Sequence, residues 1–486
     1  MSGASRRAVL GTLLPGFVGT TLPDWVERML RDGLAGVCLF GENVVSTGQL
    51  RELTSAILAA NPAAVIAIDE EGGDVTRVHH RHGSPFPGNA LLGRTDDVDA
   101  TRAVAVAVGL ELRAVGVNLD FAPDADINSN PRNPVIGVRS FGAEAALVAR
   151  HTAAWTDGLQ STGVAASLKH FPGHGDTAQD SHLALPSIDV GADELRAREL
   201  APFAAGVRAG ALTVMTSHIL VPSIDAEAPA TFSPAILQGL LRGELGFTGV
   251  IVSDALDMAG ASAETGIPTA AVRALAAGCD LLCIGTKNTE AQLEEIVARV
   301  ESAPGLDRAR VEEAFGRVQA LVRSLTGSQP GMGRTSVEPP AVDRLVAAFA
   351  VAPTAADTLR DEGWVAVRVD TEANIAVGDV PWGPFRSWEE SGSGLPVIAV
   401  DEDGWAARID DIPEGAYVLV VGKDNERRPW VRSLIDTLRG RHSRVVAVDM
   451  GWPGGDSSYA EVATFGASSL VGEALAGLLS ARGVRA

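Results

Sequence analysis

Short apolar runs alternate with amphipathic segments from the N-terminus to about residue 325. Eight mainly apolar runs lie at 11–17, 36–40, 64–69, 117–126, 164–171, 212–218, 249–254 and 280–285. Helical periodicity fills 23–31, 49–60, 101–115, 145–160, 194–209, 234–243 and 269–277, and returns at 290–300 after the last run. Eight buried strands alternating with helices predict an α/β fold with an N-terminal (β/α)8 TIM barrel. A doubly wound open sheet is the alternative, but it usually has fewer strands and a Gly-rich phosphate-binding turn, which the sequence lacks.

A second domain is expected after the barrel. Residues 1–325 form the predicted catalytic barrel, and the Gly-, Ser- and Pro-containing residues 326–342 read as a linker. Further apolar runs lie at 364–369, 396–400, 417–422 and 445–448, and helical patterns at 429–438 and 470–479. They predict a smaller C-terminal α/β sandwich domain over residues 343–486, with a packing role.

Composition narrows the class of protein. The net charge of −21 argues against nucleic acid as a partner, because binding to phosphates needs basic patches. No run is long and apolar enough to predict a membrane span. The three cysteines, Cys38, Cys279 and Cys283, lie in apolar runs without CxxC spacing, which predicts buried, reduced thiols and favours a cytoplasmic location. We expect a monomer or a homodimer.

Polar residues collect where the predicted strands end. The strand ends carry Asp69-Glu70-Glu71, Asp124 and Asp126, Lys169-His170, Ser217-His218 and Asp254. In TIM barrels the carboxyl ends of the strands carry the catalytic groups. Any one of these residues could simply cap the following helix. Five strands that all end in this way predict an active site instead.

The chemistry of this predicted site rests on a few side chains. Asp254 follows a fully apolar run, and is a candidate nucleophile or charge stabiliser whose cationic neighbours would be Lys169 and His170. Asp180 and His182 are two residues apart, so the carboxylate can hold one imidazole tautomer and raise its basicity. The guanidinium of Arg139 suits hydrogen bonds to ligand oxygens.

A metal site is the competing interpretation of the histidine-rich loop. Zinc could be bound by His170, His174, Asp176, Asp180 and His182. The Gly-Pro-Gly context gives no rigid ligand spacing, and the segment is not an HExxH helix. We therefore expect no metal and no cofactor.

Four motifs in order give a specific resemblance. Residues 169–182 are similar to the KHFPGHG-x4-DSH motif of the glycoside hydrolase family 3 β-N-acetylglucosaminidases of the NagZ type. Residues 68–73 resemble that family's acidic DEEGG-like segment, 133–142 its arginine loop, and 249–258 its nucleophile segment. The similarity extends over roughly residues 8–325.

The resemblance implies a retaining double displacement. Asp254 would attack the anomeric carbon, and His182 would protonate the leaving oxygen while Asp180 orients it. Asp69, Arg77, Arg139, Lys169 and His170 would hold the sugar in the −1 site. The implied substrate is a small carbohydrate with a terminal β-linked N-acetylglucosamine, in peptidoglycan fragments or chitooligosaccharides.

Several alternatives stay open. A histidine in place of the acid carboxylate repels anions less, so phosphate could replace water and give a sugar 1-phosphate. The enzyme could also be a β-glucosidase or have dual specificity, and a catalytically silent sugar-binding protein is the alternative outside the enzymes. Asp74 stands where many relatives carry arginine, which could alter contacts beyond the −1 sugar.

Overall fold

The structure is a computed structural model that describes residues 5–178, 185–263, 265–327, 341–360, 362–373, 375–392 and 394–485. The chain divides into two compact units. The first unit comprises Met1–Glu71, Val98–Ile136 and Ser140–Pro339, and the second comprises Gly72–Asp97, Gly137–Arg139 and Pro340–Ala486. Most of the expected linker at 326–342 lies outside the described residues, and the domain boundaries at 325 and 343 stay a prediction.

The first unit is a barrel of eight parallel strands among the described residues. Its strands are β1 (Leu13–Pro15), β2 (Gly36–Leu39), β3 (Val65–Ile68), β4 (Leu119–Asp120), β5 (Ala165–Phe171), β6 (Thr213–Thr216), β7 (Val250–Ser253) and β8 (Leu281–Gly285). Consecutive strands from β2 to β8 pair with one another, and β8 also pairs with β1. Each strand lies within one of the eight apolar runs, so the TIM-barrel prediction is confirmed.

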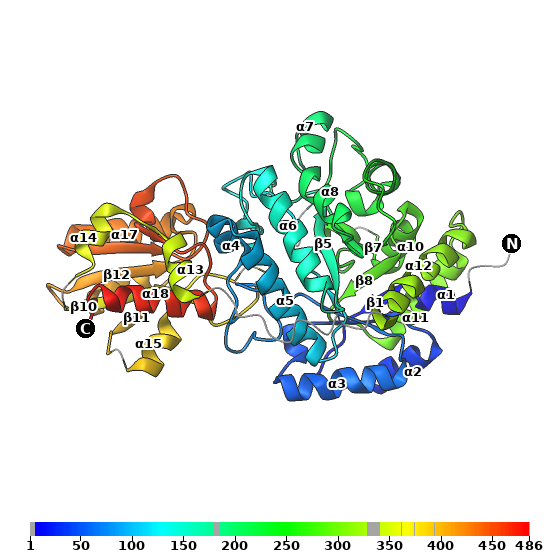
Figure 1. The fold of residues 1–486 in the computed structure, drawn as a ribbon, viewed down its shortest axis with the longest axis horizontal. Coiled ribbons are helices and arrows are strands. Elements are labelled where there is room, and N and C mark those ends of the chain that lie inside the picture. The colour runs from blue at the N-terminus through cyan, green and yellow to red at the C-terminus, as the bar shows by residue number, and fades with distance from the viewer. Residues whose placement is uncertain are drawn as a thin grey trace. The chain divides into compact units, whose positions relative to one another are not determined.

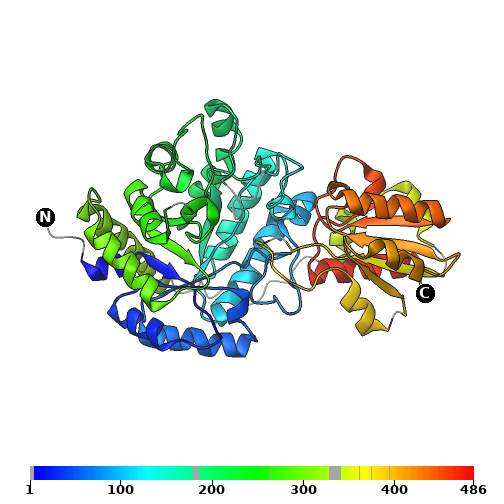
Figure 2. The same cartoon turned by 180° about the vertical axis from the view of Figure 1, so that it is seen from behind.

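Helices surround these strands (Figures 1 and 2). They are α1 (Arg6–Leu10), α2 (Asp24–Asp32), η1 (Gly41–Asn43), α3 (Thr47–Ala60), α5 (Val98–Ala114), α6 (Ala145–Gln160), α7 (Ala192–Ala197), α8 (Leu200–Arg208), η3 (Ala230–Phe232), the π-type helix η4 (Ala235–Glu244), α9 (Ala259–Ser262), α10 (Ile267–Ala277), α11 (Glu290–Ser302) and α12 (Arg308–Gly327). Local sequence fixes their ends: the Ser46 hydroxyl accepts the Gln49 N–H at the start of α3, and Gly33 ends α2 with a left-handed φ of 111°.

The barrel core is apolar and closely packed. Alternate strand residues such as Val65 and Ala67, or Val250 and Val252, share one buried cluster. Cys38 and Cys283 belong to this cluster, and Cys279 is also buried, so all three thiols are free and enclosed as predicted. No helix in the described ranges is long and apolar enough to cross a membrane.

One helix differs from its prediction. The single helix expected over 194–209 is two helices, α7 and α8, which meet at Arg198 and Glu199. At this break the Arg198 guanidinium pairs with the carboxylates of Glu199 and Asp176. The tertiary contacts of these two side chains therefore override the helical periodicity.

The second unit is built on a six-stranded sheet in the order β11-β10-β12-β13-β14-β9. Its strands are β9 (Ala350–Val351), β10 (Trp364–Val369), β11 (Val397–Val400), β12 (Tyr417–Gly422), β13 (Val445–Asp449) and β14 (Val462–Ala463). The strands are parallel except β9, which pairs antiparallel with β14. The four longer strands were predicted, whereas β9 and β14 have two residues each and show no periodicity.

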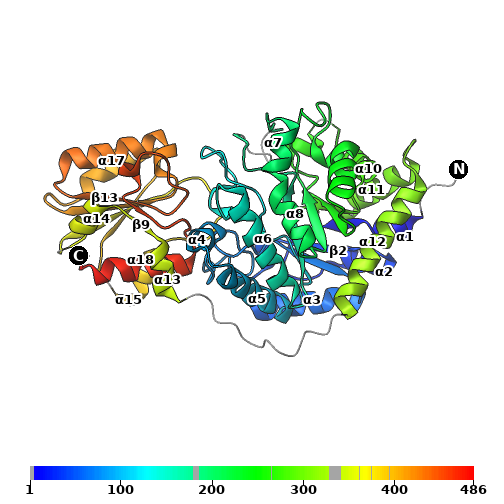
Figure 3. The same cartoon turned by 45° about the horizontal axis from the view of Figure 1, so that its top comes forward.

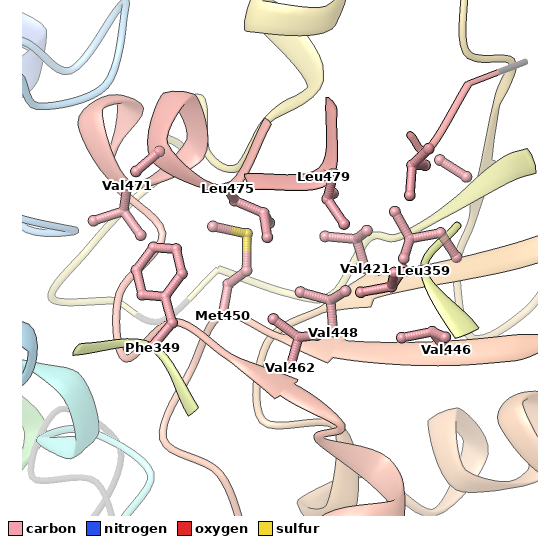
Figure 4. Close-up of a cluster of buried hydrophobic side chains, with 14 of the residues drawn as sticks. Phe349, Leu359, Val421, Val446, Val448, Met450, Val462, Val471, Leu475 and Leu479 are labelled. Carbon is pink, nitrogen blue, oxygen red and sulfur yellow. The ribbon is translucent and has the colours of Figure 1, made fainter. Parts of the chain in front are cut away.

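Helices cover both faces of this sheet, which confirms the α/β sandwich (Figure 3). They are α4 (Asn89–Thr95), η2 (Gly137–Arg139), α13 (Val342–Ala348), α14 (Pro353–Thr358), α15 (Phe385–Ser391), α16 (Trp405–Arg408), η5 (Ile409–Asp411), η6 (Asn425–Arg427), α17 (Pro429–Arg441), η7 (Ser457–Tyr459) and α18 (Ser469–Ala481). Because side chains alternate along a strand, Val418 and Val420 pack with α17, whereas Leu419 and Val421 pack with α18. Figure 4 shows the cluster on the α18 face, around Met450.

We expect this cluster to contribute measurably to the stability of the second unit. Val448 is fully buried in it, so Val448→Ala should lower the free energy of unfolding by about 2 kcal/mol through lost burial and a residual cavity. Val397→Ala is the matched control in the same sheet, because Val397 is 41% exposed. Urea unfolding measures both variants, and equal losses would contradict the assignment of this core.

Candidate active site

The carboxyl edge of the barrel carries charged side chains from five strands. Asp69 follows β3, Asp120 ends β4, Lys169 and His170 lie in β5, and Asp254 follows β7. His218 follows β6. The parallel barrel therefore brings residues that are up to 185 positions apart in the sequence to one edge.

Lys169 is a buried cation held by two carboxylates. Its Nζ lies 2.7 Å from Asp69 Oδ1 and 2.7 Å from Glu71 Oε1. The side chains of Lys169 and Glu71 are each 2% exposed, whereas that of Asp69 is 19% exposed. A buried ammonium needs such partners, because desolvation otherwise favours its neutral form. Asp69 is thus the member of the group that a ligand can reach.

A buried carboxyl with a raised pKa lies on β4, between the strands that supply this ion pair. Burial raises the pKa of Asp120 well above its usual value, and the charge of Glu70 adds to that rise. The backbone N–H of Glu70 donates to Asp120 Oδ1 at 2.9 Å, and the charge of Lys169 opposes the shift. Asp120 therefore fixes the backbone after β3, and burial favours its protonated form more than that of an ordinary carboxyl.

Asp126 organises the two histidines of the loop that follows β5. Its Oδ2 lies 2.7 Å from His170 Nδ1, and its Oδ1 accepts the backbone N–H groups of His170 and His174. Burial alone would raise the pKa of Asp126, but the two histidines hold it below its ordinary value. The carboxylate stays ionised and holds the His170 ring, leaving Nε2 for other contacts.

His174 is a neutral, structural neighbour of this pair. Burial lowers its pKa to about 4, against the opposing attraction of Asp126. Its Nδ1 lies 2.7 Å from the Thr177 hydroxyl, and the charge of Asp254 acts on it as well. The ring therefore fills the space beneath the loop and adds no charge at neutral pH.

Asp254 is half-buried at the end of β7. Its backbone N–H donates to the Thr216 hydroxyl at 3.3 Å, and its Oδ1 accepts the Ala255 N–H at 2.8 Å. His218 Nε2 donates to the Ala255 carbonyl at 3.0 Å. Hydrogen bonds from the ends of β6 and β7 therefore fix the turn that presents the Asp254 carboxylate.

A second carboxylate network supports the loop after β5 from outside. Glu199 Oε1 accepts from Arg198 Nε at 2.6 Å, and the same guanidinium donates to Asp176 Oδ2 at 2.9 Å. Burial raises the pKa of Glu199 to about 7. A Cβ on Gly173 would lie 2.9 Å from Glu199 Oε2, so this glycine is required for the close approach of the loop.

The metal interpretation finds little support in this arrangement. Asp176 forms an ion pair with Arg198, and His170 shares a hydrogen bond with Asp126. Among the described residues, donor atoms of Asp124, Asp126 and His170 lie within 4.8 Å of one another. His170 Nδ1 and Asp126 Oδ2 already face each other at 2.7 Å, and Asp124 Oδ1 accepts the Asp126 N–H at 2.9 Å.

The predicted arginines lie in the second unit. The Arg77 guanidinium donates to the carbonyls of Ala376 and Val377, at 2.6 and 3.1 Å. Arg139 is 6% exposed, and its carbonyl accepts from Asn89 Nδ2 at 2.6 Å. Their role toward a sugar stays a prediction, as does that of Asp180 and His182, which lie outside the described residues.

The sequence motifs did not predict the roles of several residues that support this site. Glu71 was part of a motif, and Asp126 was one of several acids at a strand end. Glu199 lay inside a segment interpreted as one continuous helix. In the sequence, Glu199 differs from the apolar residues that follow it in the predicted helix only by being polar.

The geometry suits the binding of a polar, uncharged ligand that develops positive charge. Asp69 and Lys169 offer an acceptor and a donor to hydroxyl groups, and His170 adds a ring nitrogen. Asp254 supplies an oriented carboxylate that can attack or stabilise an electrophilic carbon.

The chain is similar to known proteins over more than half of its length. The model of the glycosyl hydrolase family 3 N-terminal domain matches residues 20–321. Beta-hexosaminidase A of Pseudoalteromonas piscicida is 36% identical over 365 residues, which cover 68% of this chain and 61% of that protein. The chain therefore spans less than two thirds of the length of that relative. A beta-hexosaminidase of Stenotrophomonas maltophilia (strain K279a) is 41% identical over 283 residues, or 56% of this chain and 82% of the relative.

Solved structures extend the similarity. A glycoside hydrolase family 3 beta-N-acetylglucosaminidase from Paenibacillus sp. str. FPU-7 has a TM-score of 0.85 at 29% identity, and the match covers 98% of this chain and 96% of that one. NagZ from Neisseria gonorrhoeae has a TM-score of 0.54 at 32% identity, covering 65% of this chain and 97% of that one. The first of these two matches includes the greater part of both units.

The buried Glu199 carboxyl predicts a pH-dependent stability. Its pKa is raised from 4.5 to about 7, so the folded protein binds this proton more tightly than the unfolded chain does. Stability is therefore lost as pH rises from about 4.5 to 7, by about 3 kcal/mol at most. Glu199→Gln removes this loss, so the variant should gain stability relative to wild type between pH 4.5 and pH 8.

Urea unfolding at pH 5 and pH 8 measures the effect. Glu194→Gln is the matched control, because Glu194 is bonded to the same Arg198 but is 54% exposed. An identical pH dependence for wild type and Glu199→Gln would contradict the assigned protonation.

Proposed function

The chain belongs to glycosyl hydrolase family 3, and on this premise we propose that it is a retaining exo-β-N-acetylglucosaminidase. It removes terminal N-acetylglucosamine from peptidoglycan fragments or chitooligosaccharides through a covalent glycosyl-enzyme. The names of the similar proteins, beta-hexosaminidase and beta-N-acetylglucosaminidase, support the choice of sugar. The free, buried thiols fit a cytoplasmic enzyme.

The observation that carries the proposal is the oriented carboxylate of Asp254 on an edge that also holds the Asp69–Lys169 pair. In the first step Asp254 attacks the anomeric carbon while the glycosidic oxygen leaves. The Ala255 N–H donates to Oδ1 and holds the carboxylate in one orientation. Asp69 and Lys169 bind sugar hydroxyl groups and hold the ring in place for the attack.

The negative charge of the edge supports the same chemistry. Lys169 carries one positive charge against the carboxylates of Asp69 and Glu71. The transition state of glycoside hydrolysis resembles an oxocarbenium ion, so its ring carries positive charge. A slight excess of carboxylates therefore stabilises the transition state more than the neutral substrate.

We assign proton transfer to Asp180 and His182, which lie outside the described residues. His182 protonates the leaving oxygen and then activates the acceptor, and Asp180 polarises its ring. A histidine can perform both roles near neutral pH because its ordinary pKa is close to 7. Sugar binding by Arg77 and Arg139 is proposed from the sequence motifs.

Replacement of the nucleophile should remove activity and leave the fold intact. Asp254→Asn keeps the size of the side chain but cannot form the glycosyl-enzyme, so kcat/KM on an aryl β-N-acetylglucosaminide should fall by roughly 10⁴-fold or more. Asp257→Asn is the control, because Asp257 is an exposed acid three residues further along. Near-normal turnover by Asp254→Asn would reject the nucleophile assignment.

The stereochemistry of the first product tests the double displacement. Proton NMR during hydrolysis of the same aryl glycoside should show the β-anomer of N-acetylglucosamine before mutarotation, because two inversions retain configuration. An initial α-anomer would exclude the mechanism. A parallel reaction with phosphate should still give mainly the free sugar. Accumulation of a sugar 1-phosphate would instead assign phosphorolysis, and faster cleavage of the aryl glucoside would assign a β-glucosidase.

A further inference from the structure

The second unit contains a large cavity for which the proposed hydrolysis has no use. Its volume is about 1000 Å³, within the range of small-molecule binding sites. A second hollow of about 700 Å³ adjoins it and shares the side chains of His82 and Arg386. Every residue that lines either hollow belongs to the second unit.

The cavity lies where an open α/β sheet most often binds ligands. In chain order the strands run β10, β11, β12, β13, β14, but in the sheet β10 lies between β11 and β12. The chain thus leaves β10 toward one side and returns to the other, which opens a crevice at the carboxyl ends of β10 and β12. Arg368 and Asp370 come from the end of β10, and Lys423 directly follows β12; all three line the cavity.

Two cations of the cavity wall are held against aromatic rings. Lys423 Nζ lies 4.8 Å from the centre of the Trp382 ring, and the Arg368 guanidinium lies 5.5 Å from that of Phe385. The two rings meet edge to face, with their centres 5.2 Å apart. Such packing limits the rotation of long basic side chains, so less entropy is lost when they bind an anion.

The balance of charges favours an acidic group on the ligand. Arg81, Arg386 and two histidines join Lys423 and Arg368 in the lining, in a chain whose net charge is −21. Arg368 is paired with Asp370 at 2.9 Å. Within the described residues Lys423 has no carboxylate within 4.0 Å of its ammonium group, and the exposed Arg81 forms no ion pair. Lys423 also attracts the half-buried Asp74, whose Oδ1 accepts the Ala467 N–H.

The same lining offers acceptors for hydroxyl groups. Asp379 and Glu389 add carboxylates to the cavity. His80 Nδ1 donates to the Arg77 carbonyl at 3.1 Å, which leaves Nε2 as an acceptor. The half-buried Trp382 adds an apolar surface of the kind that packs against the C–H face of a sugar ring.

From this combination we propose that the second unit has its own binding site for a carboxylate-bearing saccharide. The carboxylate binds to Lys423 and Arg81, the hydroxyl groups bind to the acids and His80, and the ring lies against the aromatic wall. The site gives the second unit a ligand-binding role in place of the packing role expected from sequence. It does not depend on the proposed hydrolysis.

Three related probes test the chemistry of the site. N-acetylmuramic acid is N-acetylglucosamine with a lactyl ether, so N-acetylglucosamine lacks the carboxylate and lactate lacks the sugar. Ligand-observed NMR titration of the full chain should show the tightest binding for N-acetylmuramic acid, and this binding should persist in excess N-acetylglucosamine. Equal binding of lactate would reduce the site to a simple anion site, and equal binding of N-acetylglucosamine would make it a neutral sugar site; both outcomes overturn the proposal.

Variants place the binding in the cavity. Arg81→Gln and Lys423→Gln should each weaken N-acetylmuramic acid binding about tenfold, through the loss of one charge-assisted hydrogen bond. Lys423→Gln removes the cation near Asp74 and could unfold the protein. In that case Arg81→Gln still tests the site, because Arg81 is exposed. Arg360→Gln, at an exposed arginine elsewhere in the second unit, is the control and should bind as wild type does. Unchanged affinity in both cavity variants would refute the site.

Failure of this proposal can be told apart from failure of the proposed function. The titration involves no turnover, and hydrolysis of the aryl β-N-acetylglucosaminide is measured separately on wild type. Absent hydrolysis with intact, carboxylate-dependent binding would overturn only the hydrolase. Normal hydrolysis without such binding would overturn only the cavity site.

Discussion

The buried ammonium group of Lys169 is the interaction on which the carboxyl edge of the barrel depends. An ammonium that is 2% exposed is stable only if its lost hydration is replaced, and Asp69 and Glu71 replace it at 2.7 Å each. These partners leave β3, whereas Lys169 lies in β5, so the ion pairs span β4. On β4, burial raises the pKa of Asp120, whose Oδ1 accepts the backbone N–H of Glu70. One buried charge thereby fixes three neighbouring strand ends relative to one another.

The position of the loop after β5 depends on His170, the residue next to Lys169. His170 is held by Asp126, which also binds the His174 backbone, so the loop is anchored to the end of β4 before it reaches residue 178. Glu199 and Arg198 support it from the other side through Asp176 and the glycine at 173. In the proposed mechanism this support matters because Asp180 and His182 follow residue 178 closely in the sequence. This support requires a buried carboxyl, that of Glu199. Its pKa is raised because Arg198 only partly offsets the burial.

The two units use parallel sheets in different ways. The eight barrel strands lie around one axis, so their carboxyl ends form a ring. The second unit keeps its sheet open and reverses direction between β10 and β12, which leaves a crevice instead. In the barrel the charged residues are buried and paired. In the open sheet the basic residues are half-buried against aromatic rings and stay accessible to a ligand.

By itself the sequence determined the elements and most of the candidate chemistry. Continuous apolar runs identified all eight barrel strands, because burial on both faces leaves a strong local signal. Similar runs identified the four longer strands of the second sheet, although the edge strand β11 is partly exposed. The motif residues at the strand ends identified Asp69, Lys169, His170 and Asp254. Only the tertiary structure decided which acids pair with which cations. Local periodicity cannot encode contacts between distant segments. Such contacts determine the roles of Glu71, Asp126 and Glu199, the break between α7 and α8, and the cavity at the ends of β10 and β12.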